Sequence, residues 1–270
     1  MARWSARPNQ PQTRVRIVSA LIIALPALAA VYFGTPYLQL FILLCGGIVA
    51  WEWARLCGGG VLDWTGWLLI VAVLGALLSG AYGYYGTAIW AAGAAAIASG
   101  LSRLIRRSGA AGWHALGVLY VSLAGLSVMW LRQFGEGGPA VLFWLFAVVW
   151  LTDTGAYVAG RGLGGPKLAP AISPNKTWAG FFGGLVAGAL VGLAAGALWP
   201  GREPASMAAF SVGLALAAQA GDLFESSLKR RFGVKDSSRL IPGHGGLLDR
   251  IDSLLAASLV VSLAYWIGAA

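Results

Sequence analysis

Charged side chains are scarce in this sequence. Asp, Glu, Lys and Arg make up 11% of its residues, and 58% of the residues are hydrophobic. A soluble domain of ordinary composition carries roughly 25% charged residues, so this chain lacks the polar surface that such a domain needs. The composition predicts an integral membrane protein and leaves no room for a separate soluble domain.

Cysteine and histidine are also rare. The only cysteines, Cys45 and Cys57, lie in or beside the same apolar run, so they provide neither a disulfide framework nor a thiolate metal site. His114 and His244 are the only histidines, which argues against a histidine metal site. Any metal in this protein is therefore expected to bind oxygen ligands.

Long polar stretches are missing, and apolar runs take their place. Crossing a hydrocarbon core of about 30 Å takes roughly 20 apolar residues in a helix. Nine such windows lie at about residues 17 to 34, 37 to 56, 66 to 84, 86 to 104, 113 to 131, 139 to 159, 178 to 199, 205 to 224 and 250 to 269. The sequence predicts an all-α polytopic membrane protein with about nine transmembrane helices.

The first window follows Arg14 and Arg16, so a cleaved signal peptide is its competing interpretation. The length of the window and the unbroken series of spans after it favour a transmembrane helix. We therefore divide the chain into a basic cytoplasmic N-terminus (1–16), N-terminal transmembrane helices (17–131) and a C-terminal transmembrane region (139–270).

The cations are distributed unevenly. With a cytoplasmic N-terminus, nine crossings leave only Arg132 and Arg202 of the 19 Lys and Arg residues outside, as the positive-inside rule demands. The net charge of +9 then indicates contact with anionic lipid and requires no nucleic acid. We expect a cytoplasmic (inner) membrane protein whose two long polar segments, 160–177 and 225–249, face the cytoplasm.

Four aspartates lie in or at the ends of the spans, where ionisable groups are costly and usually functional. Asp153 is near the cytoplasmic end of the sixth span and Asp222 ends the eighth, while Asp249 and Asp252 share a face at the start of the last. The alternative is a structural duty, since Arg161 could pair with Asp153 and a helix dipole favours acids at its N-terminus. Together the four would supply oxygen ligands for magnesium, which usually takes one or two carboxylates plus substrate phosphates.

The eighth span ends in a polar stripe. Gln219, Asp222, Ser226 and Lys229 follow in steps of three and four, which predicts one polar helix face as the helix leaves the membrane. A solvated helix end is the plainer interpretation, but it does not explain why Gln219 and Asp222 lie one turn apart inside the apolar part of the span.

The segment 160–177 ends in "SPNKTW". Ser173 is predicted to N-cap a helix that begins with Pro174, and Lys176 and Thr177 follow in its first turn. Free N–H groups beside a lysine and a hydroxyl would form a phosphate site; an ordinary capped membrane helix is the alternative. A P-loop is excluded, because Pro166 precedes Lys167 and no Ser or Thr follows it.

The segment 225–249 contains "PGHGG", whose glycines allow the backbone to approach a ligand closely. His244 is more consistent with a hydrogen-bonding loop residue than with a general base. The cations of the segment lie between acidic pairs, although a basic loop is usually an inner-face anchor. They are Lys229, Arg230, Arg231, Lys235 and Arg239.

Between these segments, the seventh span carries a glycine at every fourth position. The ladder consists of Gly180, Gly184, Gly188, Gly192 and Gly196. Such spacing lets helix backbones approach closely. Packing within the chain is the favoured interpretation, and a homodimer interface is the alternative.

The stretch "SSLKRRFGVKDSSRLIPGHGGLLDRIDS", which begins at Ser226, closely resembles the signature of phosphatidate cytidylyltransferases, also called CDP-diacylglycerol synthases. "TDTGAYVAGR" and "LAPAISPNKTWAG" resemble the preceding block of that family, and "EWARL" from Glu52 resembles its early Glu-Trp element. The matching positions of the signature are Ser227, Lys229, Arg230, Lys235, Asp236, Pro242, Gly243, His244, Gly245, Gly246, Asp249, Arg250 and Asp252. The sequence departs from the family pattern at Asn175, Ala179 and Ser238, which leaves those positions without a predicted role.

The resemblance implies transfer of a cytidylyl group from CTP to phosphatidate in a magnesium-dependent reaction carried out by the region 139–270. Asp222 and Asp249 are the implied metal ligands, with a second metal ion left open, and Asp153 and Lys229 join them as catalytic residues. The remaining implied substrate-binding residues are Ser173, Lys176, Thr177, Arg230, Lys235, Asp236, His244, Arg250 and Asp252.

Several other functions share parts of this pattern. A polyprenol kinase or a cytidylyltransferase for another lipid would share most of these features. An ion-coupled transporter also has many spans and intramembrane acids, but such proteins often show inverted repeats, and we find none here. A CDP-alcohol phosphatidyltransferase would need an Asp-Gly-x-x-Ala-Arg element, which is absent.

Overall fold

The computed structural model describes residues 12–105, 109–134, 137–241 and 245–268. Within these ranges the chain forms nine helices and one short hairpin. The helices are α1 (Gln12–Phe33), α2 (Tyr37–Cys57), α3 (Trp64–Ala81), α4 (Tyr85–Ile105), α5 (Ala111–Arg132), α6 (Gly138–Leu163), α7 (Trp178–Leu198), α8 (Pro204–Arg231) and α9 (Leu248–Trp266). The helices α2 to α8 are long and apolar enough to cross a membrane, so the prediction of an all-α polytopic membrane protein is confirmed.

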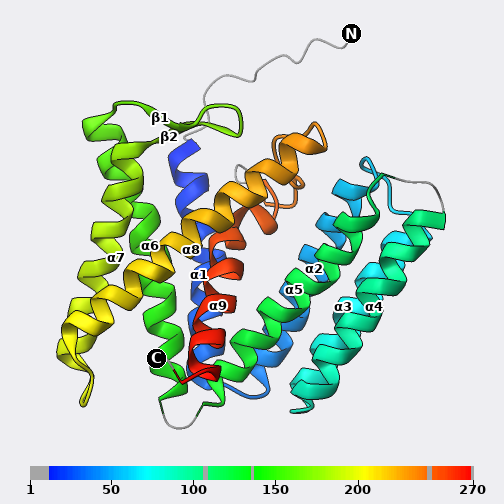
Figure 1. The fold of residues 1–270 in the computed structure, drawn as a ribbon, viewed down its shortest axis with the longest axis horizontal. Coiled ribbons are helices and arrows are strands. Elements are labelled where there is room, and N and C mark those ends of the chain that lie inside the picture. Colours follow the sequence, from blue (N-terminus) through cyan, green and yellow to red (C-terminus); the bar gives the residue numbers. More distant parts are fainter. Residues whose placement is uncertain (1–11, 106–108, 135–136, 242–244, 269–270) are drawn as a thin grey trace.

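The helices form two groups around a central pair (Figure 1). α6 and α7 lie on one side, α2 to α5 lie on the other, and α8 crosses diagonally in front from the first group toward the second. Between them run α1, which contacts α2 and α6, and α9, which contacts α8, α5, α6 and α2. The last helix thus joins the two groups, so residues at its beginning can meet residues from both.

Two helices extend beyond their apolar windows. α8 continues to Arg231 rather than ending near residue 224, and α6 continues to Leu163. Hydropathy does not reveal such extensions, because the added turns are polar. In α8 they are stabilised by the pair of Glu225 and Lys229 one turn apart and by basic residues in the last turn, where the helix dipole favours cations.

The predicted helix start at Ser173 is wrong. Lys167–Ala169 (β1) and Ser173–Thr177 (β2) form an antiparallel hairpin, and α7 begins only at Trp178. Thr177 is the N-cap, since its Oγ1 accepts a hydrogen bond of 3.1 Å from the N–H of Gly180. Threonine caps a helix nearly as well as serine does, and a proline is tolerated in a two-stranded hairpin, where every strand is an edge.

The glycine ladder of α7 packs within the chain. All five glycines are buried. A Cβ on Gly192 would collide with the backbone of α8 at Met207, and one on Gly184 would press against the carbonyl of Thr152 on α6. The ladder therefore lets α7 lie close to both neighbours, which confirms the interpretation as intramolecular packing.

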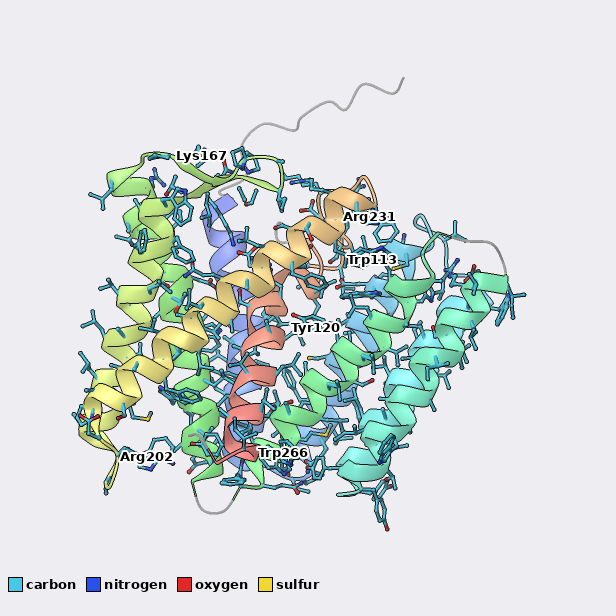
Figure 2. All side chains as sticks on the ribbon, in the orientation of Figure 1. Trp113, Tyr120, Lys167, Arg202, Arg231 and Trp266 are labelled. Atoms are coloured by element: carbon cyan, nitrogen blue, oxygen red, sulfur yellow. The ribbon has the colours of Figure 1, made fainter. Side chains whose placement is uncertain are left out.

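Aromatic side chains tie α8 to the other helix group. Phe224 contacts Trp53 of α2 and Trp113 and Tyr120 of α5, with ring centroids 5.5 to 6.4 Å apart. Two turns further, Arg231 stacks over the ring of Trp113 at 5.6 Å, and both residues are labelled in Figure 2. The polar end of α8 is therefore held in a fixed position against α2 and α5.

Candidate active site

The end of the molecule that carries the hairpin, uppermost in Figure 1, gathers most of the residues that the sequence singled out. α2, α6 and α8 end there, and α7 and α9 begin there. We call it the hairpin end. Figure 2 shows Lys167 and Arg231 at the hairpin end and Arg202 at the opposite end. Charged groups from α2, α6, α8, α9 and the hairpin therefore lie on this side of the molecule.

Three of the predicted acids form what we call the acidic group: Asp153 on α6, Asp222 on α8 and Asp252 on α9. They lie close enough for their charges to act on one another. Lys176 Nζ, from the hairpin, lies 2.5 Å from Asp222 Oδ2, and the charges of Lys176 and Arg250 also act on Asp153. Two cations thus face three carboxylates, which leaves negative charge in excess.

The polar stripe on α8 is confirmed. Gln219 Nε2 donates to the carbonyl of Phe181 on α7 at 3.3 Å. One turn later, Asp222 Oδ1 accepts a hydrogen bond of 3.4 Å from Ser226 Oγ. Asp222 faces Asp153 of α6, Asp252 of α9 and Lys176 of the hairpin, and Gln219 contacts α7, so the spacing of the stripe serves contacts with neighbouring elements as well as with water.

A second set of charges, the anchor network, consists of Glu52, Glu225, Lys229 and Asp249. Lys229 Nζ lies 2.6 Å from Glu225 Oε2 and 2.7 Å from Asp249 Oδ1, and the three side chains are 12%, 2% and 4% exposed. Buried charges are tolerated when they are paired in this way. Lys229 therefore fastens the end of α8 to the beginning of α9.

Asp249 is held by further donors. The backbone N–H of Ser237 donates to its Oδ2 at 3.0 Å, the Ser237 hydroxyl donates at 3.1 Å, and the N–H of Gly246 donates at 2.7 Å. Together with Lys229, these donors occupy both carboxylate oxygens. Asp249 thus fixes the loop between α8 and α9 as well as the start of α9.

Glu52, near the end of α2, is fully buried and joins the same loop from the other side. Its carboxylate accepts hydrogen bonds from the N–H groups of Leu247 and Leu248 at 2.9 and 2.7 Å. The hydroxyl of Ser238 donates to it at 2.6 Å, and the hydroxyl of Ser237, which donates to Asp249 at 3.1 Å, lies 3.3 Å from Glu52 Oε2. The carboxylate caps the first turn of α9, where free N–H groups and the helix dipole favour an anion.

Two glycines of the signature are required by this packing. Gly245 has φ +83° and a Cβ there would collide with Asp249. At Gly246, a Cβ would overlap both the Ser237 hydroxyl and the Glu52 carboxylate. Gly245 and Gly246 therefore allow the loop to pack directly against the carboxylates of Asp249 and Glu52. The sequence predicts that these glycines make room for a ligand, and in the structure they make room for side chains of the protein itself.

The two predicted metal ligands have different surroundings. Asp222 is partly exposed and paired with Lys176, whereas the oxygens of Asp249 already accept several hydrogen bonds. Among the described residues, no group of three or more His, Cys, Asp or Glu side chains is arranged to hold a metal alone. Magnesium does not need such a group when phosphates complete its shell, so the acidic group fits the ion with Asp222 as its most available ligand.

The other predicted residues separate into two places. Arg250 and Asp153 line an apolar cavity between the helices, whereas Lys235 and Asp236 line a polar cleft of about 670 Å³ between the end of α2 and the loop after α8. Arg230 donates to the carbonyls of Ile172 and Val234, each at 3.2 Å, and so holds the hairpin to that loop. Ser173 lies in β2. His244 lies outside the described residues.

Several residues of the site carried no predicted role. Glu225, Ser237 and Ser238 belong to this set, and Glu52 was noted only as part of a resemblance. Two of these residues carried a signal in the sequence. Glu52 is an ionisable residue inside an apolar span, where such a residue is costly, and Glu225 stands one helical turn before Lys229, where it can form an ion pair. For the two serines there was no such signal, because only the folded loop brings them to Glu52.

Comparison with known proteins places the chain among enzymes. A profile described as the cytidylyltransferase family matches residues 14–267. A protein of Brucella suis named phosphatidate cytidylyltransferase is 37% identical over 266 residues, which is 93% of this chain and 92% of that protein. One of the same name from Staphylococcus saprophyticus is 43% identical over 145 residues, covering 51% of this chain and 54% of that protein.

Proposed function

This chain belongs to the cytidylyltransferase family, and we propose that it transfers the cytidylyl group of CTP to phosphatidate. A phosphate oxygen of phosphatidate attacks the α-phosphorus of CTP, and the bond from that phosphorus to the bridging oxygen breaks. The products are CDP-diacylglycerol and pyrophosphate. This reaction is supported by the similarity of the chain, over almost its whole length, to proteins named phosphatidate cytidylyltransferase.

The observation that carries the proposal is the position of the acidic group. It lies where an apolar cavity lined by Asp153 and Arg250 reaches the hairpin end, and a polar cleft lined by Lys235 opens at the same end. One substrate is an anionic lipid that stays in the membrane, and the other is a nucleotide that stays in water. A site between an apolar and a polar opening suits both.

The phosphatidate phosphate is already an anionic nucleophile, so the reaction needs no strong general base. The protein has to hold two anions that repel each other, aligned for attack, and to neutralise charge on the α-phosphate and the leaving pyrophosphate. Lys176 and Arg250, beside the acidic group, are the proposed phosphate contacts. Lys229 has two of its three donors engaged by Glu225 and Asp249, and we assign the third to a phosphate.

Asp222 and Asp249 remain the proposed magnesium ligands, together with substrate phosphates. Magnesium supplies positive charge that screens the phosphates from the carboxylates and from each other. Asp249 would have to give up one of its present donors to serve as a ligand, and Asp252, next to Asp222 in the acidic group, is the alternative. Asp153 contributes negative charge at the same place.

We propose that the protein lies in the cytoplasmic membrane with the hairpin end in the cytoplasm. The uneven distribution of Lys and Arg supports this orientation, since Arg202 is at the opposite end from Lys167 and Arg231. CTP would then reach the polar cleft directly. A cysteine introduced at the exposed Lys167 should react with an impermeant maleimide only in inside-out vesicles.

A homodimer is a further proposal. Because the glycine ladder is used within the chain, we assign the contact with a second copy to the outward row of Phe182, Val186 and Leu190 on α7, which is exposed. A cysteine pair formed across two copies at Val186 would support the dimer, and a monomer by mass measurement in native lipid would contradict it.

The reaction is tested by incubating the purified full chain with phosphatidate, magnesium and CTP labelled on the α-phosphate, and in a parallel reaction on the γ-phosphate, which only a kinase would transfer to a lipid. We expect label in the lipid extract and release of pyrophosphate, and neither product when magnesium is replaced by a chelator. Diacylglycerol and a polyprenol serve as acceptor controls. Label on the polyprenol alone, or no lipid label with any acceptor, would overturn the proposal.

A further inference from the structure

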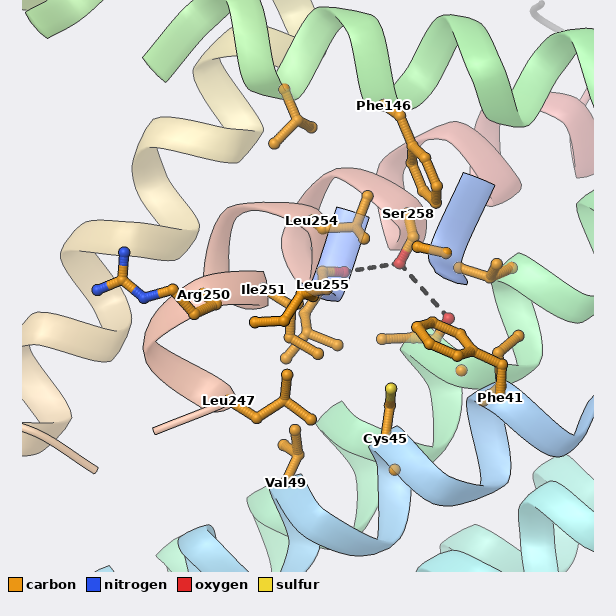
Figure 3. Close-up of a pocket in the computed structure, with 18 of the residues that line it drawn as sticks. Phe41, Cys45, Val49, Phe146, Leu247, Arg250, Ile251, Leu254, Leu255 and Ser258 are labelled. Atoms are coloured by element: carbon orange, nitrogen blue, oxygen red, sulfur yellow. Dashed lines mark hydrogen bonds between the residues drawn. The ribbon is translucent and has the colours of Figure 1, made fainter. Parts of the chain in front are cut away.

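A second pocket, which we call the distal pocket, lies at the end of the molecule opposite to the hairpin. Its volume is about 180 Å³, and the side chains that line it include Trp144 of α6, Arg202, Glu203, Phe210 of α8 and Tyr265 of α9. It is separate from the apolar cavity beside Arg250 (Figure 3), because no described residue lines both. The distal pocket is thus built by α6, α8 and α9, the three helices that carry the acidic group toward their other ends.

The distal pocket lies at the level where lipid headgroups are expected. Figure 2 shows Arg202 and Trp266 at the end opposite to Lys167. Exposed apolar side chains adjoin the lining residues along the chain, since Trp266 and Ile267 follow Tyr265. Tryptophan and tyrosine gather where the hydrocarbon core of a membrane meets the headgroups. The molecule best placed to enter the pocket is therefore a lipid of that leaflet.

Arg202 supplies the cation of the pocket. Its guanidinium stacks over the ring of Trp199 at 5.6 Å, and its charge acts on the phenol of Tyr265. Among the described residues, no carboxylate forms an ion pair with it. Arg132, another cation at this end, is engaged within the fold, since its Nε donates to the carbonyl of Val31 at 2.8 Å. A guanidinium without an acid partner at headgroup level suits a phosphate, whose oxygens match its fork of donors.

Glu203 supplies the anion of the pocket. Its carboxylate oxygens accept hydrogen bonds from the N–H groups of Ala205 and Ser206 at 2.9 and 2.5 Å, which fixes the side chain as the N-cap of α8. Arg202 precedes it in the sequence, yet in the part of the chain that the structure describes no ion pair joins the two. Each carboxylate oxygen can accept a further hydrogen bond. The pocket therefore holds a cation and a carboxylate that remain available to a ligand.

Aromatic rings form much of the remaining wall. The rings of Trp144 and Phe210 stack with their centroids 5.5 Å apart, and Tyr265 lines the pocket from α9. The faces of such rings attract an ammonium group. A molecule that carries both a phosphate and an ammonium would therefore find a matching group for each.

We propose that the distal pocket binds the headgroup of a zwitterionic phospholipid, with its phosphate on Arg202 and its ammonium between Glu203 and the aromatic rings. A purely anionic lipid would bring its charge next to Glu203 and leave that carboxylate unused. The bound lipid is not the acceptor of the proposed reaction, because the acidic group lies toward the other end of the same helices, so the inference goes beyond the proposed function. By contacting α6, α8 and α9 together, the lipid adds its binding free energy to the stability of the folded chain.

The first experiment is native mass spectrometry of the full-length protein, stripped of lipid in detergent and mixed with equal amounts of phosphatidylethanolamine, phosphatidylcholine and phosphatidylglycerol. We expect one zwitterionic lipid to bind about tenfold more tightly than phosphatidylglycerol, the difference that one charge-assisted hydrogen bond makes. The two zwitterionic lipids show whether a primary or a quaternary ammonium is preferred. Equal or tighter binding of phosphatidylglycerol would overturn the proposal. Displacement of the bound lipid by excess phosphatidate would place it in the active site and overturn the proposal as well.

Substitutions then locate the bound lipid. Arg202→Gln should weaken its binding by about tenfold or more, whereas Lys167→Gln, which removes an exposed cation at the hairpin end, should leave the binding unchanged. Glu203→Gln keeps an oxygen for the cap of α8 but loses the charge, so the preference over phosphatidylglycerol should largely disappear. Unchanged binding by Arg202→Gln, or an unchanged preference in Glu203→Gln, would contradict the assignment.

Thermal unfolding separates loss of the site from a folding defect, because each variant is compared with itself in the absence of lipid. The preferred zwitterionic lipid should raise the unfolding temperature of the unmodified protein and of Lys167→Gln, and should not raise that of Arg202→Gln. An equal rise in Arg202→Gln would place the lipid elsewhere on the protein and overturn the proposal.

Discussion

Two clusters of buried charge lie at the hairpin end, and they differ in their balance of charge. The α3–α5 cluster consists of Asp63, Arg103 and His114: Arg103 lies 3.2 Å from Asp63 and donates to His114 Nε2 at 2.8 Å. Among the described residues, this cluster thus pairs one acid with one cation. In the acidic group and the anchor network together, the described residues bring six acids against the cations Lys176, Lys229 and Arg250.

The difference separates a structural charge from a functional one. A balanced buried pair is complete without a ligand, and its loss affects folding. An excess of carboxylates is unfavourable until positive charge arrives from outside the protein, and magnesium with its phosphates can supply it. We therefore expect substitutions in the two regions to separate catalysis from stability, and order them by their expected effect on turnover.

The largest effect is expected at Asp222. Asp222→Asn keeps the shape of the side chain but removes the negative charge that attracts magnesium, so turnover should fall by about a hundredfold or more with little loss of stability. Turnover at increasing magnesium and thermal unfolding in detergent measure the two quantities. The matched control is Asp63→Asn, which should lower the unfolding temperature and keep turnover. Normal turnover of Asp222→Asn at limiting magnesium would remove Asp222 from the metal site.

The same magnesium titration distinguishes Asp249 from Asp252. If Asp249 is a ligand, Asp249→Asn should need more magnesium for half-maximal turnover, and its unfolding temperature should fall as well because it loses acceptors for Lys229 and Ser237. A change in magnesium dependence confined to Asp252→Asn would instead assign the second ligand to Asp252.

A smaller effect on turnover, about tenfold, is expected at Glu52, which acts by positioning. Glu52→Gln replaces an oxygen that accepts hydrogen bonds by an amide that donates, opposite the N–H of Leu247 or Leu248. The start of α9, which carries Asp252, should shift, and one unsatisfied buried donor costs about 1–3 kcal/mol of stability. A fall in kcat larger than that of an equally destabilised α3–α5 variant would support positioning. Equal falls would reduce Glu52 to a structural residue.

Glu52 also shows which parts of the fold and of the site can be predicted from the sequence. The spans, the polar stripe on α8 and the packing of the glycine ladder follow from periodicity and hydropathy, which depend on neighbours along the chain. The contact of Glu52 with the loop after α8 joins residues 185 to 196 positions apart, and no local pattern encodes it. The hairpin was missed for a related reason: Ser173 and Thr177 are both good caps, and only the pairing of β2 with β1 decides between them.

A modest effect is expected at Thr177, beside the acidic group. Thr177→Ala removes the acceptor for the N–H of Gly180 and should lower stability by about 1 kcal/mol. Because Lys176 precedes it, we expect a several-fold rise in KM for CTP. Thr177→Ser keeps the hydroxyl and should restore both values. Restored stability without restored KM would show that the methyl group, and not the cap, positions Lys176.

The smallest effect on turnover is expected at Arg103 of the α3–α5 cluster, although its substitution should lower stability considerably. Arg103→Met removes the cation from the α3–α5 cluster and leaves Asp63 without its ion pair to Arg103, at a cost of about 2 kcal/mol. Since the cluster carries no excess charge for a substrate to neutralise, turnover per folded molecule should stay within about twofold. Turnover is measured below the unfolding temperature of the variant and normalised to the folded fraction. A tenfold loss there would mean that balanced charge at this end of the molecule also serves the reaction, and the distinction between the two clusters would no longer hold.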